Sequence, residues 1–148
     1  MTHALAVALA IGLILLLIGI AALHAYWGLG GRWPGRDEPT LAGLVIGSTR
    51  GGRMPGPLAC FAVAAALLAG AGLVGLISFG SAGGVIYGLA KVGYITCALV
   101  FTVRGAVGYV PAIWRRSAGT PFVELNTRYY SPLCLLIGAG MFANLLGR

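Results

Sequence analysis

Residues 4–23, ALAVALAIGLILLLIGIAAL, decide the fold, because they contain no charged or amide side chain. A helix needs about 20 apolar residues to cross the hydrocarbon core of a bilayer, and this stretch is that long. Tyr26 and Trp27 follow it, and such aromatic side chains are enriched at membrane–water interfaces. No basic residue precedes the stretch, so we expect a retained transmembrane helix over about residues 4–27 rather than a cleaved signal peptide.

The composition agrees with a membrane protein. Of the 148 residues, 59% are hydrophobic and 9% are charged, whereas a soluble domain has about 25% charged residues. We expect a single membrane domain over residues 1–148. The net charge of +7 lies in loops beside apolar segments, which predicts contact with anionic lipid headgroups and no nucleic-acid partner.

Three further apolar segments predict three more transmembrane helices, at about residues 57–79, 85–110 and 131–146. Pro57 and Pro132 each stand where a proline is favoured, at the first turn of a helix, and Pro111 follows the third segment. The predicted fold class is therefore an all-α membrane protein, a compact four-transmembrane-helix bundle. Helices pack in lipid through small residues, and we expect Ala62, Ala66 and Gly70 of the second helix, with glycines such as Gly105 and Gly138, to supply them.

Two connecting segments carry local signals. In the Gly- and Arg-rich first loop, the apolar residues 41–49 are too short to span, and the turn-forming residues 50–53, RGGR, follow them. We expect a short hairpin at the interface. Residues 120–130 begin with Thr120-Pro121, which predicts a short interfacial helix with Phe122, Leu125 and Tyr129 facing the lipid.

The arginines predict the orientation. The N-terminal tail and the loop between the second and third helices have none, whereas the first loop has Arg32, Arg36, Arg50 and Arg53 and the third has Arg115, Arg116 and Arg128. The positive-inside rule therefore places the first and third loops in the cytoplasm and both termini outside.

Arg104 is the strongest functional candidate inside a predicted span, because a charged residue at that depth costs a few kcal/mol on insertion scales. Two interpretations stay open. The side chain either extends to the headgroups, or faces the bundle and binds an anion or a carboxylate, for which Glu124 is the only nearby candidate. Lys91 lies on another face of the same helix, and we expect it to extend outward.

His24 also has two interpretations. It is either an interfacial histidine bonded to a backbone carbonyl or a general base, a role that the imidazole side chain often has in enzymes. No second histidine stands at ligand spacing, and the three cysteines form no Cys-x-x-Cys motif, so we expect neither a metal site nor a disulfide. Asn144 in the fourth helix is expected to bond across to another helix.

Aromatic and charged residues gather at the predicted cytoplasmic side, where an anionic lipid head, a quinone head or a small anion would suit them. An equal alternative is that they only fix the third loop to the bundle. The candidate ligand-binding residues are His24, Tyr26, Trp27, Trp33, Arg104, Tyr109, Glu124, Arg128, Tyr129 and Tyr130.

Three strings give the chain a family resemblance: HAYWGLGGRWP at residues 24–34, Arg104-Gly105, and TPFVELNTRYYSPLC at residues 120–134. Together they resemble a family of small bacterial four-helix membrane proteins catalogued as a domain of unknown function, family 3995. The resemblance implies the fold and a location in the bacterial inner membrane. It implies no activity and no cofactor.

Three classes of function remain. Binding of a lipid, quinone or small anion at the cytoplasmic-side interface ranks first. A membrane-embedded enzyme with His24 or Glu124 as acid/base ranks second, without a recognisable catalytic dyad or nucleotide-binding loop. An oligomeric small-solute transporter or channel ranks third, since the predicted spans contain no acidic residue.

Overall fold

The computed structural model describes residues 2–48, 52–80 and 83–147. Over these residues the chain is helical and contains no strand, and four helices are long and apolar enough to cross a membrane. They are α1 (His3–Gly28), α3 (Pro57–Phe79), α4 (Gly84–Val107) and the continuous segment Pro121–Leu146. The prediction of an all-α, four-helix, multi-pass membrane protein is confirmed, although the third helix ends at Val107 rather than near residue 110.

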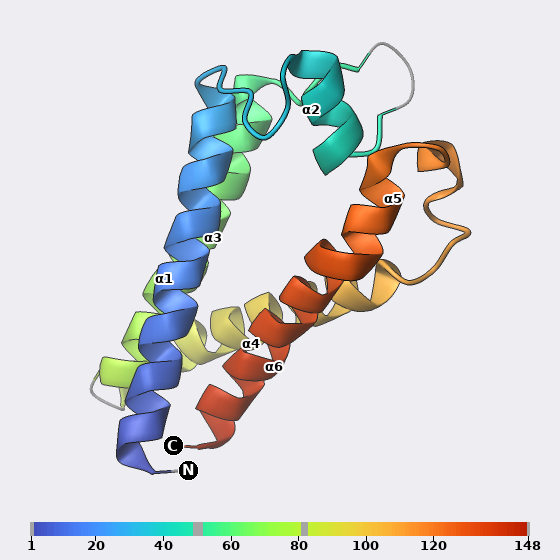
Figure 1. Cartoon of the computed structure of the whole chain (residues 1–148). Coiled ribbons are helices and arrows are strands. Elements are labelled where there is room, and N and C mark those ends of the chain that lie inside the picture. Colours follow the sequence, from blue (N-terminus) through green and yellow to red (C-terminus); the bar gives the residue numbers. More distant parts are fainter. Residues whose placement is uncertain (1, 49–51, 81–82, 148) are drawn as a thin grey trace.

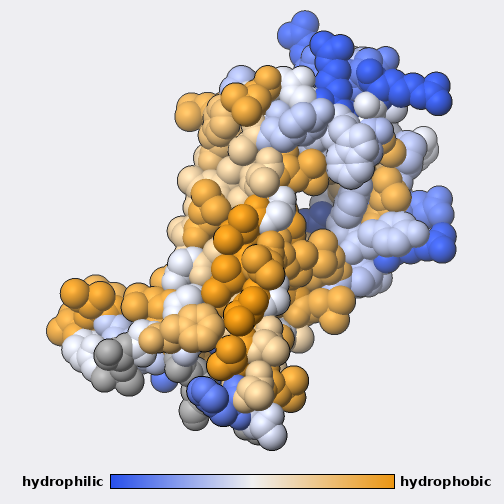
Figure 2. Space-filling model, turned by 60° about the vertical axis from the view of Figure 1, so that its left-hand side comes forward, coloured by the Kyte–Doolittle hydropathy of each residue, from blue (hydrophilic) through white to orange (hydrophobic). Residues whose placement is uncertain are grey.

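The four long helices are arranged in two pairs (Figure 1). Helix α1 packs along α3, and α4 packs along the last helix, α6 (Ser131–Leu146). Both chain termini lie at one end of the molecule, and the segment between α1 and α3 lies at the opposite end, which we call the loop end. Hydrophilic residues are concentrated at the loop end, and apolar residues cover the sides of the helices (Figure 2).

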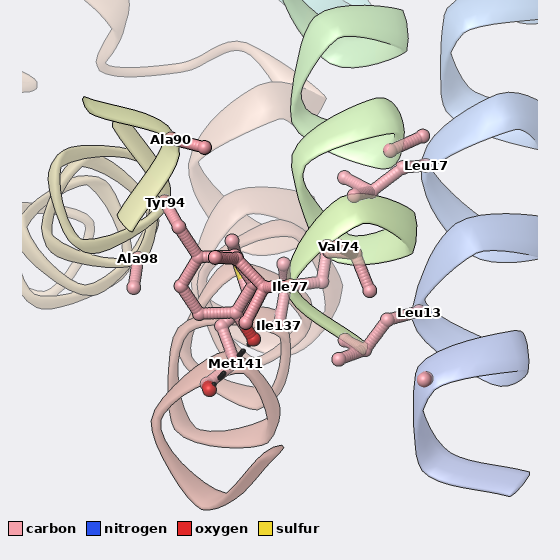
Figure 3. Close-up of a cluster of buried hydrophobic side chains, with 11 residues drawn as sticks. Leu13, Leu17, Val74, Ile77, Ala90, Tyr94, Ala98, Ile137 and Met141 are labelled. Atoms are coloured by element: carbon pink, nitrogen blue, oxygen red, sulfur yellow. Dashed lines mark hydrogen bonds between the residues drawn. The ribbon is translucent and has the colours of Figure 1, made fainter. Parts of the chain in front are cut away.

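The two pairs meet around Tyr94, whose side chain is fully buried among Val74, Ile77, Ile137 and Met141 (Figure 3). The Tyr94 hydroxyl donates a hydrogen bond to the Met141 carbonyl oxygen at 2.8 Å and lies 3.1 Å from Asn144 Oδ1. Ser78 Oγ donates to the same Asn144 oxygen at 3.0 Å. These bonds join α3, α4 and α6, and they confirm that Asn144 bonds across to other helices.

The predicted hairpin in the first loop is wrong, because its apolar half is a helix, α2 (Glu38–Val45). Asp37 caps this helix by accepting a hydrogen bond from the Thr40 N–H at 2.8 Å, and hydrogen bonds from Thr40 lower the pKa of the Asp37 carboxyl. Leu41 and Ala42 form the buried face. The capping aspartate and the proline after it, Pro39, are helix-start signals that outweigh the later turn signal. Residues 50 and 51 of that predicted turn lie outside the described residues.

A short helix does begin at Pro121, after Thr120, as predicted, but it is not separate from the last span. Helix α5 (Pro121–Leu125) continues through a single π-helical turn, η2 (Asn126–Tyr130), directly into α6 (Figure 1). The Ser131 N–H bonds to the Asn126 carbonyl, five residues earlier. A proline lacks an N–H and clashes with the carbonyl four residues before it, and the wider π-helical turn lets the helix continue through Pro132. Phe122 is 2% exposed and therefore does not face lipid, unlike Tyr129 at 53%.

Small residues bring α4 and α6 together, as predicted for Gly105 and Gly138. A Cβ atom on Gly138 would lie 3.1 Å from the Ala98 carbonyl oxygen, and one on Gly105 would lie 2.9 Å from the Ser131 carbonyl oxygen. The predicted stripe on α3 is wrong in its first two members, because Ala62 and Ala66 are exposed. The close approach of α4 and α6 therefore occurs at Gly105 and Gly138.

The close contact at Gly138 gives a test of the fold. Gly138→Ala forces its new methyl group against the backbone of α4, and we expect a loss of about 1–3 kcal/mol in the free energy of unfolding. Gly72→Ala is the matched control, since a Cβ there meets nothing within 4 Å and the change raises helix propensity. Unfolding by a denaturing detergent in mixed micelles measures both. Equal stabilities of the two variants would contradict this packing.

Candidate functional site

The structure divides the ten predicted residues between two places at the loop end. His24, Tyr26, Trp27 and Trp33 lie at or just after the end of α1, and the other six belong to the end of α4 and to α5–η2. Helix α2 lies between these two places (Figure 1). It contacts both, since Val45 lines a pocket with His24, and the Leu44 carbonyl accepts a hydrogen bond from the Tyr130 hydroxyl at 3.3 Å.

Arg104 faces the bundle. Its Nη2 donates a hydrogen bond to Asn126 Oδ1 at 2.8 Å, and its Cζ lies 5.2 Å from the centre of the Trp114 ring. A cation over an indole face is attracted by the negative potential of the ring. The Trp114 indole is itself fixed, because its Nε1 donates to the Val107 carbonyl at 3.0 Å. The side chain is therefore directed at Asn126 and Trp114, which agrees with the second interpretation in that it faces the bundle.

The prediction that Glu124 is the partner of Arg104 is wrong. Glu124 instead forms an ion pair with Arg128 at 3.9 Å, and both side chains are largely exposed, at 79% and 67%. The Arg128 Cζ also lies 5.4 Å from the centre of the Tyr129 ring. These three residues lie at the surface and line neither of the two pockets described below.

Sequence reasoning groups Asn126 with the polar residues of the third loop but does not assign it as the partner of Arg104. Asn126 is 1% exposed, and its Oδ1 accepts from both Arg104 and Ser131 Oγ, the latter at 3.3 Å. Its Nδ2 donates at 3.0 Å to the carbonyl of Gly108, which lies at the end of α4 where carbonyls lack helical partners. An arginine inside a span needs a hydrogen-bond acceptor, and this requirement could have pointed to Asn126. It favoured Glu124 instead, because a carboxylate is a stronger acceptor than the amide two residues later.

One guanidinium nitrogen of Arg104 remains without a partner. Its Nη1 is buried and makes no hydrogen bond in the part of the chain that the structure describes. An unpaired buried donor costs about 1–3 kcal/mol, and more when it is charged. The position of Nη1 is therefore suited to an acceptor that the described residues do not provide.

A pocket of about 250 Å³ lies next to the residues that hold Arg104, although Arg104 itself does not line it. Trp114 and Asn126, the two residues that hold the guanidinium, are part of its wall, together with Tyr109, Val123 and the basic residue Arg115. Most of the remaining wall is apolar. The arrangement combines an apolar cavity with an unpaired donor beside it and a second cation at its rim.

Aromatic packing fixes the third loop over this pocket. The Trp114 and Phe122 rings lie 5.1 Å apart, and the Phe122 and Tyr130 rings lie 6.1 Å apart. These are ordinary separations for attractive aromatic pairs. These ring contacts join three residues of the third loop to one another, and the Tyr130 hydroxyl links that loop to α2 through the Leu44 carbonyl.

The group at the end of α1 surrounds a separate pocket of about 200 Å³, whose wall includes His24 and Trp27. His24 Nδ1 lies 2.9 Å from the Ile20 carbonyl oxygen, which confirms the interpretation of a histidine bonded to the backbone. Trp27 Nε1 donates to the Trp33 carbonyl at 2.8 Å, and the Trp33 N–H approaches the Tyr26 hydroxyl at 3.5 Å. Trp33 itself is 66% exposed.

Within the described ranges, no three His, Cys, Asp or Glu side chains lie close enough together to hold a metal ion. Cys60, Cys97 and Cys134 are free thiols.

Asn126 gives a test of the site. Asn126→Ala leaves a second Arg104 nitrogen and the Gly108 carbonyl unpaired, and we expect unfolding to become easier by about 1–3 kcal/mol. Thr127→Ala is the control, because the exposed Thr127 hydroxyl bonds only to carbonyls of its own helix. Detergent-induced unfolding measures both variants. A loss no larger for Asn126→Ala than for Thr127→Ala would show that Arg104 does not depend on the amide.

A family model described as "Protein of unknown function (DUF3995)" matches residues 17–141 of the chain. The matched range includes the end of α1, α2 and the whole of the Arg104 site. No curated protein and no solved structure shows a significant match.

Proposed function

The chain belongs to the DUF3995 family of proteins of unknown function, and we propose that it is a membrane protein that binds an anionic phospholipid through Arg104. The observation that carries the proposal is the buried Arg104 Nη1, which has no acceptor among the described residues. A phosphate oxygen is a strong acceptor for guanidinium N–H groups. We place the protein in the bacterial inner membrane, with the loop end and its arginines in the cytoplasm, where anionic lipids attract basic residues.

The pocket beside Arg104 supports a lipid rather than a free inorganic ion. Its wall is largely apolar, with Pro111, Ala118 and Val123 among the lining residues, and such a wall suits an acyl chain. Arg115 lines the same pocket and supplies a second positive charge. Asn126 and Trp114 hold the Arg104 guanidinium in place before any ligand arrives, which lowers the entropy that binding must remove.

Of the other two functional hypotheses, the enzyme gains only the observation that His24 lines a pocket, and the transporter gains none. The enzyme hypothesis needs His24 or Glu124 beside a substrate cavity, but Glu124 is exposed and paired with Arg128. His24 lines the pocket at the end of α1, apart from Arg104. The oligomeric transporter or channel would require a partner copy.

Lipid retention gives a direct test of the proposal. The protein is reconstituted with equal amounts of phosphatidylglycerol and phosphatidylcholine, released gently, and weighed by native mass spectrometry. We expect the wild type to retain phosphatidylglycerol. Arg104→Gln should retain at least about tenfold less phosphatidylglycerol, because glutamine keeps hydrogen-bonding capacity but removes the charge.

Lys91→Gln is the matched control, since Lys91 is an exposed cation in the same helix. It should retain as much phosphatidylglycerol as the wild type. Equal retention by Arg104→Gln and the wild type, or equal losses in both variants, would overturn the assignment of Arg104 as the lipid-binding residue.

A further inference from the structure

We propose that the pocket at the end of α1 binds the ring of a quinol, and that His24 Nε2 accepts a hydrogen bond from the quinol hydroxyl. This pocket contains neither Arg104 nor any residue of the lipid site, so the inference goes beyond the proposed function and does not depend on it.

The hydrogen bond of His24 to the backbone determines what the ring can do. A carbonyl oxygen is only an acceptor, so the Nδ1 atom that lies 2.9 Å from the Ile20 carbonyl must carry the proton. In the neutral ring the other nitrogen, Nε2, then has a lone pair and no proton. His24 lines the pocket, and its neutral ring can therefore accept a hydrogen bond from a ligand and cannot donate one.

The wall of the pocket favours an uncharged aromatic ligand. Apart from His24, it consists of Trp27, Val45, Ile46, Met54, Pro55, Ala59, Cys60 and Val63, and it includes no arginine, lysine or carboxylate. A phosphate or carboxylate would have no counter-charge there, and burying it would be costly. An indole and a thioether are favourable neighbours for a flat ring.

The size and position of the pocket fit a ring that carries an apolar tail. Its volume of about 200 Å³ is below the roughly 300–1,000 Å³ of sites that enclose a whole drug-sized ligand, so it accommodates a headgroup only. Ile46 and Val63, at 39% and 43% exposed, continue the apolar wall onto the outer surface of the helices. A tail attached to the ring can lie along this surface in the bilayer.

The walls are held in place without a ligand. The Trp27 indole is fixed by its bond to the Trp33 carbonyl at 2.8 Å. Glu38 Oε1 accepts a hydrogen bond from the Met54 N–H at 3.0 Å, which ties the start of α2 to the segment before α3. The Cys60 thiol, 5% exposed, points to the Pro55 carbonyl at 3.6 Å. A pocket formed in advance loses less entropy on binding.

The two oxidation states of one ligand provide the sharpest test. Duroquinol has hydroxyl donors, whereas duroquinone has only carbonyl acceptors, so an unprotonated Nε2 distinguishes them. Titration calorimetry of the full chain in phosphatidylcholine nanodiscs, with empty nanodiscs subtracted, should show at least about tenfold tighter binding of duroquinol. We expect His24→Phe, which keeps a ring but has no nitrogen, to remove this preference, and His3→Phe, at the other end of α1, to leave it unchanged.

A second variant tests the pocket independently, in case His24→Phe does not fold. Ala59 is an exposed residue at the start of α3 that lines the pocket, and Ala59→Phe should fill it and abolish saturable binding of both ligands. Arg104→Gln should keep the duroquinol preference whether or not it loses lipid. Equal affinities of the two ligands for the wild type, or saturable binding that survives Ala59→Phe, would overturn the proposal.

Discussion

The hydrogen bond between Arg104 and Asn126 is the interaction on which the loop end of the molecule depends. A guanidinium inside a helical span must find acceptors within the protein, because the bilayer core supplies none. Asn126 meets this need from the π-helical turn, and its amide also holds the last carbonyl of α4 and the hydroxyl of Ser131. The same residue thus anchors α4, the third loop and the start of α6. The nitrogen of Arg104 that Asn126 does not reach is the one that motivates a ligand.

The four spans could be predicted because apolar length and helix-start prolines are local signals, and the bounds of α3 and α6 agree with the prediction. The pairing of the helices could not. Ala62 and Ala66 have ideal spacing for helix contact, yet the close approach occurs at Gly105 and Gly138, because which small residues meet depends on the rotation of each helix. Competition between nearby signals explains the first loop, where the cap at Asp37 selects a helix over a hairpin.

The sequence predicted several residues of the candidate site, but it did not predict which of them contact one another. Arg104 does contact Trp114, which lines a pocket together with Tyr109, and His24 does bond to a backbone carbonyl. Asn126 could not be predicted as the partner of Arg104, because a carboxylate is in general the stronger partner for an arginine. Here a π-helical turn places the neutral amide of Asn126 next to Arg104 instead. Sequence reasoning also merged two pockets into one cluster, since nothing in the sequence shows that α2 packs between the end of α1 and α5.

A double-mutant cycle between Arg104 and Asn126 tests the central claim most directly. The free energies of unfolding of the wild type, Arg104→Met, Asn126→Ala and the double variant are measured in the same detergent mixture. Direct contact predicts a coupling free energy of about 0.5–3 kcal/mol, with Asn126→Ala less damaging once the charge is removed. Additive losses, with a coupling below about 0.3–0.5 kcal/mol, would show that the two side chains act independently and would contradict the account.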